Sequence, residues 1–283
     1  MNKRLIYIIL LLFSFRIHAA TVQKQIHINK GYFAALDTTY FYYLSYNSDS
    51  TFSQQSVLIT LMQNDSLVLQ IYNHDSVDHH FFIAGKASQK IASNGSATVR
   101  LLFTQFGINL FYDDLQFPKN MYLGLSGTIA VLEQGRDTKN FYWNLRDHQK
   151  QWNIQEGNTI NLSQYDPDYF TINGQSFPVV QNDSLVKIMG KVGDTILLYM
   201  VNSGLSAHSI HFHGYHSRIV STTSKTLKKN WEKDTYPLET MENIILELIP
   251  DKPGIFPVHD HNLVAISGGG RYPNGMLIMM EIK

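Results

Sequence analysis

Short runs of hydrophobic residues, each bounded by polar turn residues, recur along the chain. The runs lie at residues 57–60, 67–72, 196–201, 244–249 and 276–282. Their length, their β-branched content and their Asn, Asp and Ser borders are typical of β-strands. Asn-Gly and Pro-Gly pairs predict turns at residues 94–95, 173–174, 253–254 and 274–275. We find no long amphipathic helix with clear caps, so the pattern predicts an all-β protein.

The same pattern occurs twice in the chain. Residues 64–73 match residues 193–202 without a gap, and the register continues until His79 meets His208. Two further blocks follow in the same order: 107–114 matches 254–261, and 127–131 matches 275–279. Three blocks in one order indicate a duplicated domain. We therefore expect two antiparallel Greek-key β-sandwiches at residues 21–135 and 161–283, joined by a linker at residues 136–160.

The first twenty residues have the pattern of a signal peptide. A basic start at Lys3 and Arg4 precedes an apolar run at 5–15, and small residues at Ala19 and Ala20 offer a cleavage site. We expect the mature chain to be exported, to the periplasm or the medium. No later segment approaches the apolar length of a membrane span, so none is expected in the mature chain.

The amino-acid composition excludes several classes of functional site. The chain has 283 residues, with 23 basic and 23 acidic side chains, 12 histidines and no cysteine. Balanced charge gives no reason to expect nucleic acid as a partner. The lack of cysteine excludes disulfides, iron–sulfur clusters and every metal site that needs a thiolate. We find neither a phosphate-binding loop nor a serine nucleophile elbow.

Two histidine pairs in the second copy are candidate metal ligands. His211 and His213 are two residues apart, as are His259 and His261. Residues i and i+2 of a strand project from the same face, so each pair can chelate an ion. If the two strands are neighbours, four imidazoles converge. Neutral imidazole suits copper, zinc, nickel and iron, while a single histidine is more often a surface or hydrogen-bonded core residue.

The second copy resembles the multicopper oxidase family. The resemblance is carried by five elements, in this order: the segment 169–174, the run His-Ser-Ile-His-Phe-His-Gly at 208–214, Pro253-Gly254, His259-Asp260-His261 and Gly275-Met276. It implies two tandem cupredoxin-like (plastocyanin-like) domains, as in two-domain laccases and copper nitrite reductases. It also implies copper as the cofactor, with His211, His213, His259 and His261 matching ligands of a trinuclear cluster. His208 matches a histidine of the blue type 1 copper site, and Met276 its axial methionine.

The chain departs from that family pattern at the type 1 site. Asp260 stands where the family has the cysteine, and a carboxylate cannot reproduce a copper–thiolate bond. The second type 1 histidine has no counterpart at 262–267. Asp260 faces away from His259 and His261, so it is either a ligand of a remnant site with His208 and Met276 or a hydrogen-bonded structural carboxylate.

The first copy has lost the matching histidines. Phe82 and residue Ala84 align with His211 and His213, while His79 alone is retained as the counterpart of His208. In two-domain family members the cluster lies between domain 1 of one subunit and domain 2 of the next, often in a trimer. The resemblance thus implies a homotrimer, but domain 1 offers no matching imidazole, and we expect no complete trinuclear cluster.

Three interpretations remain open from the sequence. The first is an exported copper-binding protein, with oxidoreductase activity at a centre made only of histidines. The second is a non-catalytic copper or zinc protein for storage, delivery or sensing. The third is a structural cupredoxin module without metal. The sequence identifies neither an electron donor nor a substrate, and fold resemblance alone does not establish activity.

Overall fold

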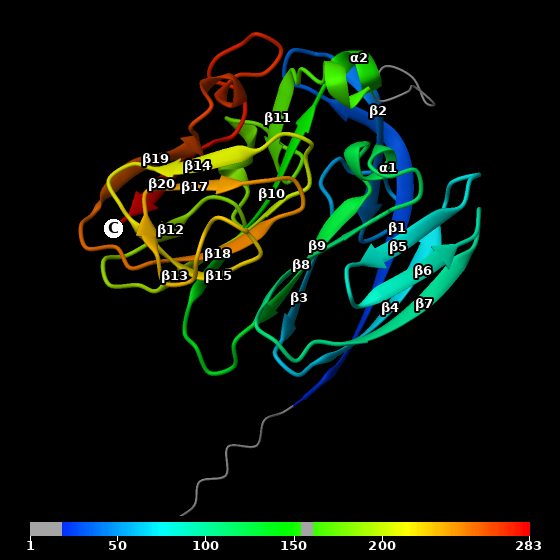
Figure 1. Ribbon diagram of the computed structural model, residues 1–283, viewed down its shortest axis with the longest axis horizontal. Coiled ribbons are helices and arrows are strands. Elements are labelled where there is room, and N and C mark those ends of the chain that lie inside the picture. The colour runs from blue at the N-terminus through cyan, green and yellow to red at the C-terminus, as the bar shows by residue number, and fades with distance from the viewer. Residues whose placement is uncertain (1–18, 154–160) are drawn as a thin grey trace, which may run out of the picture.

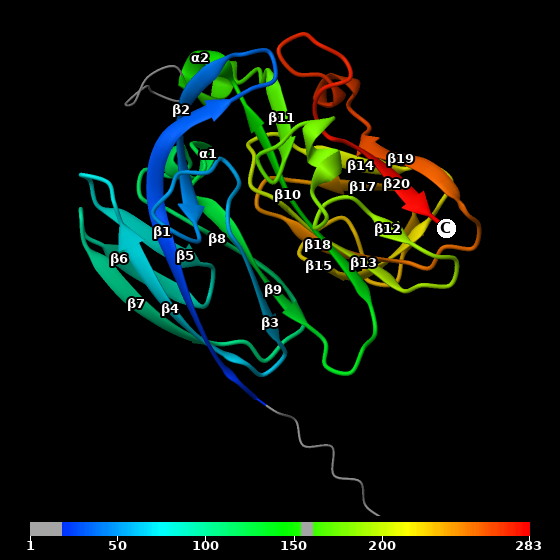
Figure 2. The same ribbon diagram turned by 180° about the vertical axis from the view of Figure 1, so that it is seen from behind.

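The protein consists of two β-sandwiches packed side by side, as the computed structural model of residues 19–153 and 161–283 shows (Figure 1). Each sandwich has two sheets, and Figure 2 shows the same two bodies from behind. The predicted fold class, all-β with two tandem cupredoxin-like sandwiches, is confirmed. Residues 1–18, which hold most of the expected signal peptide, and residues 154–160 of the expected linker lie outside the described part of the chain.

The first sandwich contains strands β1 to β9. Its sheets have the orders β2-β1-β4-β7 and β3-β9-β8-β5-β6. Most neighbours are antiparallel, but β1 with β4 and β3 with β9 run parallel. The elements are β1 (Thr21–Ala34), β2 (Tyr40–Asn47), β3 (Leu58–Met62), β4 (Ser66–Asn73), β5 (His79–Ile83), β6 (Ala87–Ile91), β7 (Ser96–Leu102), β8 (Gly107–Tyr112), the short helix α1 (Lys119–Tyr122) and β9 (Ser126–Leu132).

The second sandwich repeats this arrangement. Its sheets have the orders β11-β10-β13-β18-β15-β16 and β12-β20-β19-β14-β17. The strands are β10 (Lys139–His148), β11 (Tyr169–Ile172), β12 (Met189–Gly190), β13 (Ile196–Asn202), β14 (His208–Phe212), β15 (Ser217–Thr222), β16 (Glu232–Lys233), β17 (Thr235–Leu238), β18 (Asn243–Leu248), β19 (Gly254–Asp260) and β20 (Leu277–Ile282). The short helices are α2 (Lys150–Asn153), η1 (Leu162–Gln164), η2 (Val179–Asn182) and η3 (Leu263–Ile266). Thus β5 and β14 occupy the same place in their sheets, as do β8 and β19.

Part of the expected linker at residues 136–160 belongs to the second sandwich. Residues 139–148 form β10, which pairs with β13 in parallel and with β11 antiparallel. The reason is hydrophobic burial, because Trp143 and Leu145 face the core of this sandwich while Tyr142 faces the first domain. The segment between the domains is therefore partly a strand and not only a connection.

A third apolar cluster joins the two sandwiches. Leu110 and Ile108 of β8 pack with Tyr142, Tyr199 and other buried residues of the second domain. Buried apolar area of this kind fixes the relative position of two domains. A buried cation, Arg146 of β10, also contacts the first domain and strengthens this domain contact.

Arg146 is 2 % exposed and is hydrogen-bonded on every side. Its Nε donates to the Ser203 hydroxyl at 3.0 Å, and Nη2 donates to the Ser126 carbonyl oxygen at 2.6 Å and to the Ser56 hydroxyl at 2.7 Å. Its Nη1 also donates to the Tyr43 hydroxyl. A buried guanidinium needs such a set of acceptors, so the contacts tie β10 to the first sandwich.

The helices of the described residues are short. Among residues 19–153 and 161–283, none is long and apolar enough to cross a membrane.

Candidate metal centre

The two His-x-His pairs lie on neighbouring strands. β14 pairs antiparallel with β19, and the register sets His211 opposite His259 and Ile210 opposite Asp260. Since side chains alternate along a strand, His211, His213, His259 and His261 share the outer face of this sheet, whereas His208 and Asp260 point into the sandwich. His211 and His259 are half-buried, while His213 and His261 are exposed.

The four imidazoles converge on His211. Its ring centroid lies 4.8 Å from that of His213, 5.8 Å from that of His259 and 5.5 Å from that of His261. The Nε2 atoms of His213 and His259 are 2.9 Å apart. The structure thus brings together the residues that the sequence paired as ligands.

Hydrogen bonds orient two of these rings. Nδ1 of His259 lies 2.7 Å from the carbonyl oxygen of Asp260, which can only accept, so this nitrogen carries the proton. Nδ1 of His211 lies 2.9 Å from the hydroxyl of Thr235, and that hydroxyl donates to the Asp234 carboxylate at 3.0 Å. The hydroxyl must therefore accept from His211. In both residues Nε2 is left with its lone pair, as a metal ligand requires.

His213 completes this proton arrangement. Because Nε2 of His259 accepts, Nε2 of His213 donates the proton of the shared hydrogen bond. Burial, followed by the neighbouring His211 and His259, lowers the pKa of His213. A lowered pKa favours neutral imidazole, the form that binds metal.

The closest pair of donor atoms has the spacing of two metal ligands. Metal–nitrogen bonds of about 2.0 Å place two adjacent ligand nitrogens about 2.8–3.3 Å apart, so the His213–His259 pair at 2.9 Å can hold an ion once it displaces the shared proton from Nε2 of His213. Within the described ranges, 19–153 and 161–283, no three His, Cys, Asp or Glu side chains already surround a common point as ion ligands. The centre is therefore a converged group in which the Nε2 atoms of His213 and His259 are at ligand spacing and the ring of His211 lies 4.8–5.8 Å, between centroids, from the other three.

The secondary candidates occupy a different place. His208 and Asp260 are buried beneath the sheet, with Nδ1 of His208 2.6 Å from Oδ2 of Asp260. The other oxygen of Asp260 accepts from the backbone N–H of Asn262 at 2.9 Å and of Ser209 at 3.3 Å. Met276 is fully buried in the core of the second domain. These contacts are those of a hydrogen-bonded structural carboxylate.

Sequence reasoning missed the second carboxylate at His208. Asp147 of β10 has Oδ1 3.9 Å from Nε2 of His208 and accepts from the backbone N–H of Leu205 and of Ser206. Burial would raise the pKa of Asp147, but the charge of His208 lowers it. The sequence pattern assigns Asp147 to the linker at residues 136–160, so nothing in that pattern connects this carboxylate with His208.

The first domain holds its own buried histidine. His79 lies 2.6 Å from Asp113 through Nδ1 and 3.2 Å from Asp75 through Nε2. On the exposed face of the same sheet, His80 is hydrogen-bonded to Asp114. Phe82 and Tyr112 form an edge-to-face pair at positions where the second domain has histidines. Within the described part of this domain, the face equivalent to the histidine centre is aromatic and acidic.

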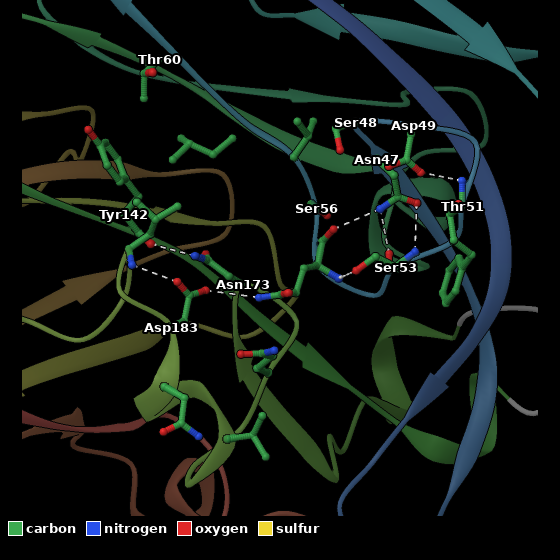
Figure 3. Close-up of a pocket in the computed structure, with 18 of the residues that line it drawn as sticks. Asn47, Ser48, Asp49, Thr51, Ser53, Ser56, Thr60, Tyr142, Asn173 and Asp183 are labelled. Carbon is green, nitrogen blue, oxygen red and sulfur yellow. Dashed lines mark hydrogen bonds between the residues drawn. The ribbon is translucent and has the colours of Figure 1, made fainter.

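A groove of about 1180 Å³ lies between the domains, lined largely by uncharged polar side chains such as Asn47 and Asn173 (Figure 3). Much of this polarity is used within the protein, since the Asn173 amide donates to the Tyr142 carbonyl and accepts from the Asn144 N–H. None of the described residues that line the groove is a histidine, so it is separate from the candidate centre.

Comparison with known structures defines the class of fold. A blue copper oxidase from Nitrosomonas europaea superposes with a TM-score of 0.79 at 21% identity, over 93% of this chain and 86% of that one. The multicopper oxidase mgLAC gives 0.78 at 20% identity, over 94% and 87%. A copper nitrite reductase from Nitrosomonas europaea gives 0.72 at 14% identity, over 93% and 94%. The fold is thus the two-domain cupredoxin fold found in these copper proteins.

Sequence comparison points to one family. Residues 140–270 match the sequence model of the multicopper oxidase family, a stretch that contains β10 and all four histidines of the centre. No curated protein sequence matches the chain. The resemblance to multicopper oxidases is therefore confirmed, for a divergent chain that has no cysteine for a type 1 copper site.

Proposed function

We propose that this chain is an exported copper-binding protein of the multicopper oxidase type, with a copper centre made only of His211, His213, His259 and His261. The observation that carries the proposal is the convergence of these imidazoles, with two Nε2 atoms at 2.9 Å. Copper follows from the fold and from imidazole ligands, which suit cupric ion. Bound copper would supply a one-electron redox couple at this surface.

The residues of the chain prepare the centre in three ways. The pairing of β14 and β19 sets the spacing of the histidine pairs. The Asp260 carbonyl and the Thr235 hydroxyl hold the Nδ1 protons of His259 and His211, so that both Nε2 atoms face outward. The exposure of His213 and His261 leaves the centre open to a small molecule or a neighbouring subunit.

Metal analysis tests the site. The complete mature protein, purified after growth with copper, should carry bound copper. The double variant His211→Ala with His261→Ala should lose it. His216→Ala is the matched control, because His216 is exposed and follows the same strand but is outside the centre. Equal copper content in the double variant and the control would refute the site.

A second function, copper delivery without catalysis, is favoured by the same exposure of His213 and His261, which allows transfer of the ion to a partner. Oxygen consumption separates the two functions, measured with a phenolic donor and with cuprous ion. Turnover that disappears in the double variant supports an oxidoreductase. Tight copper binding without turnover supports the carrier.

The export proposal rests on the residue pattern before position 21. β1 begins at Thr21, so cleavage after Ala20 leaves every described strand intact. The mass of the mature protein, recovered from the periplasm or the medium, should correspond to a chain that begins at Thr21. Recovery of the uncleaved chain from the cytoplasm would contradict it.

A further inference from the structure

Each domain buries one histidine at the same place in its fold. His79 begins β5 and His208 begins β14, the strands that lie beside β8 and β19 respectively. Both side chains are 2 % exposed, and both place Nδ1 2.6 Å from a carboxylate at the end of the neighbouring strand. That carboxylate is Asp113 in the first domain and Asp260 in the second.

The second carboxylate comes from different sequence positions in the two domains. In the first domain it is Asp75, 3.2 Å from Nε2 of His79. The sequence repeat sets Gly204 against Asp75, and a Cβ atom at Gly204 would lie 1.9 Å from Oδ1 of Asp147. The Asp147 side chain therefore fills the space in the second domain that Asp75 supplies in the first. Two routes thus place a second carboxylate on the Nε2 side of each buried histidine, at 3.2 Å in the first domain and at 3.9 Å, beyond hydrogen-bond distance, in the second.

The two carboxylates of each cluster favour the charged form of its histidine. Burial alone would lower the pKa of His208, but Asp147 and Asp260 raise it to about 9. Burial likewise opposes the charge of His79, and Asp113 and Asp75 raise its pKa. An imidazolium between two carboxylates leaves one net negative charge, which Lys30 balances in the first domain by contacting Asp75 at 2.9 Å. In the second domain, backbone N–H groups donate to both Asp147 and Asp260 and stabilise their charge.

The donor atoms do not fit the type 1 copper that the family implies. Two adjacent ligands at about 2.0 Å from an ion are at least about 2.8 Å apart, whereas Nδ1 of His208 and Oδ2 of Asp260 are in direct hydrogen-bond contact at 2.6 Å. The remaining oxygen of Asp260 already accepts from the N–H groups of Ser209 and Asn262. A type 1 site also needs a thiolate, and the chain has no cysteine.

We infer that a metal-free Asp–His–Asp ion-pair cluster has taken over the type 1 copper position in both domains, as a structural link between strands. In the second domain the cluster lies behind the histidine centre, whose His259 donates from Nδ1 to the backbone carbonyl of Asp260 and does not contact the ion pair. The chain then has no internal electron relay, and an electron donor must react at the exposed histidines themselves. This last consequence rests on the proposed function, whereas the cluster does not.

Copper stoichiometry and thermal stability of the full mature chain test the inference together. His208→Gln should leave the copper bound per chain unchanged and lower the unfolding midpoint by about 10 °C, because it leaves buried carboxylates unpaired. His213→Ala should do the reverse, losing copper with little change in midpoint. Loss of copper in His208→Gln, or an unchanged midpoint, would overturn the inference.

Two further measurements keep the test decisive if His208→Gln does not fold. Asp147→Asn preserves the shape of the side chain, lies outside the histidine centre and should likewise retain the full copper content. In the wild-type protein, the ¹⁵N shifts of the His208 ring should show both nitrogens protonated and should not move when cuprous ion is added. A shift of His208 on addition of cuprous ion contradicts a metal-free cluster. If no form of the protein binds copper, the proposed function fails while the ¹⁵N shifts and the midpoint still decide on the cluster.

Discussion

His148 is the last residue of β10 and is completely buried against the aromatic rings of Phe33, Phe41, Tyr43 and Tyr122, with ring centroids 5.3–5.6 Å away. Neither ring nitrogen has a hydrogen-bond partner among the described residues. Burial, with the charge of Arg146 as a smaller cause, lowers the pKa of His148 to about 3. The folded protein therefore holds this histidine neutral.

The lowered pKa makes stability depend on pH with a definite sign. The unfolded chain takes up a proton at His148 near pH 6.5, and the folded chain does so only near pH 3. The stabilising contribution is therefore fully present above pH 6.5 and is lost as pH falls toward 3. The unfolded histidine is half protonated at pH 6.5 and almost fully protonated at pH 4.5. Protonation therefore stabilises the unfolded state, relative to the folded state, by about 2.3 kcal/mol between these two pH values.

Replacement of His148 by Phe removes this term, because a phenyl ring fills the aromatic surroundings without titrating. We expect the free energy of unfolding of the copper-free wild type to fall by about 2.3 kcal/mol more than that of the variant between pH 6.5 and pH 4.5. Urea unfolding at the two pH values measures both free energies. His148→Leu, which has a smaller side chain that also does not titrate, is the control for the change in packing. Parallel pH dependence in wild type and both variants would refute the buried neutral state.

Three further predictions concern the domain contact, the Asp–His–Asp cluster and the histidine centre. Arg146→Leu should lower the free energy of unfolding by about 3–5 kcal/mol in urea titrations, since it leaves the buried hydroxyls facing it unpaired; a loss below 1 kcal/mol would contradict this. Gly204→Ala should destabilise the fold because its Cβ meets Asp147, whereas Gly107→Ala, with no atom within 4 Å, should have little effect on the thermal midpoint. Thr235→Val should weaken copper binding by about 10–100-fold in competition titrations, as the Nδ1 proton of His211 loses its acceptor, and Thr235→Ser should restore it; equal affinities would show that the hydroxyl does not orient the ring.

Much of the architecture follows from local patterns. The strands expected at residues 67–72, 196–201 and 244–249 match β4, β13 and β18 to within one residue at each end, because alternating or β-branched runs between turn residues have few other ways to bury their side chains. The sequence pattern does not assign segment 139–148 to either domain. Its run of apolar residues fits a strand, but only its pairing with β13 shows that it belongs to the second sandwich.

By itself the sequence determined the periodic features of this protein: its all-β character, its two domains, and the spacing that sets both histidine pairs on one face of a strand. The tertiary structure decided what depends on contacts between distant positions. Only the β14–β19 register brought His211 to His259, and only packing placed Asp147 beside His208, 61 residues further along the chain, and His148 among aromatic rings of the first domain. Hydrogen bonds and buried charges depend on separation in space, which sequence distance does not encode.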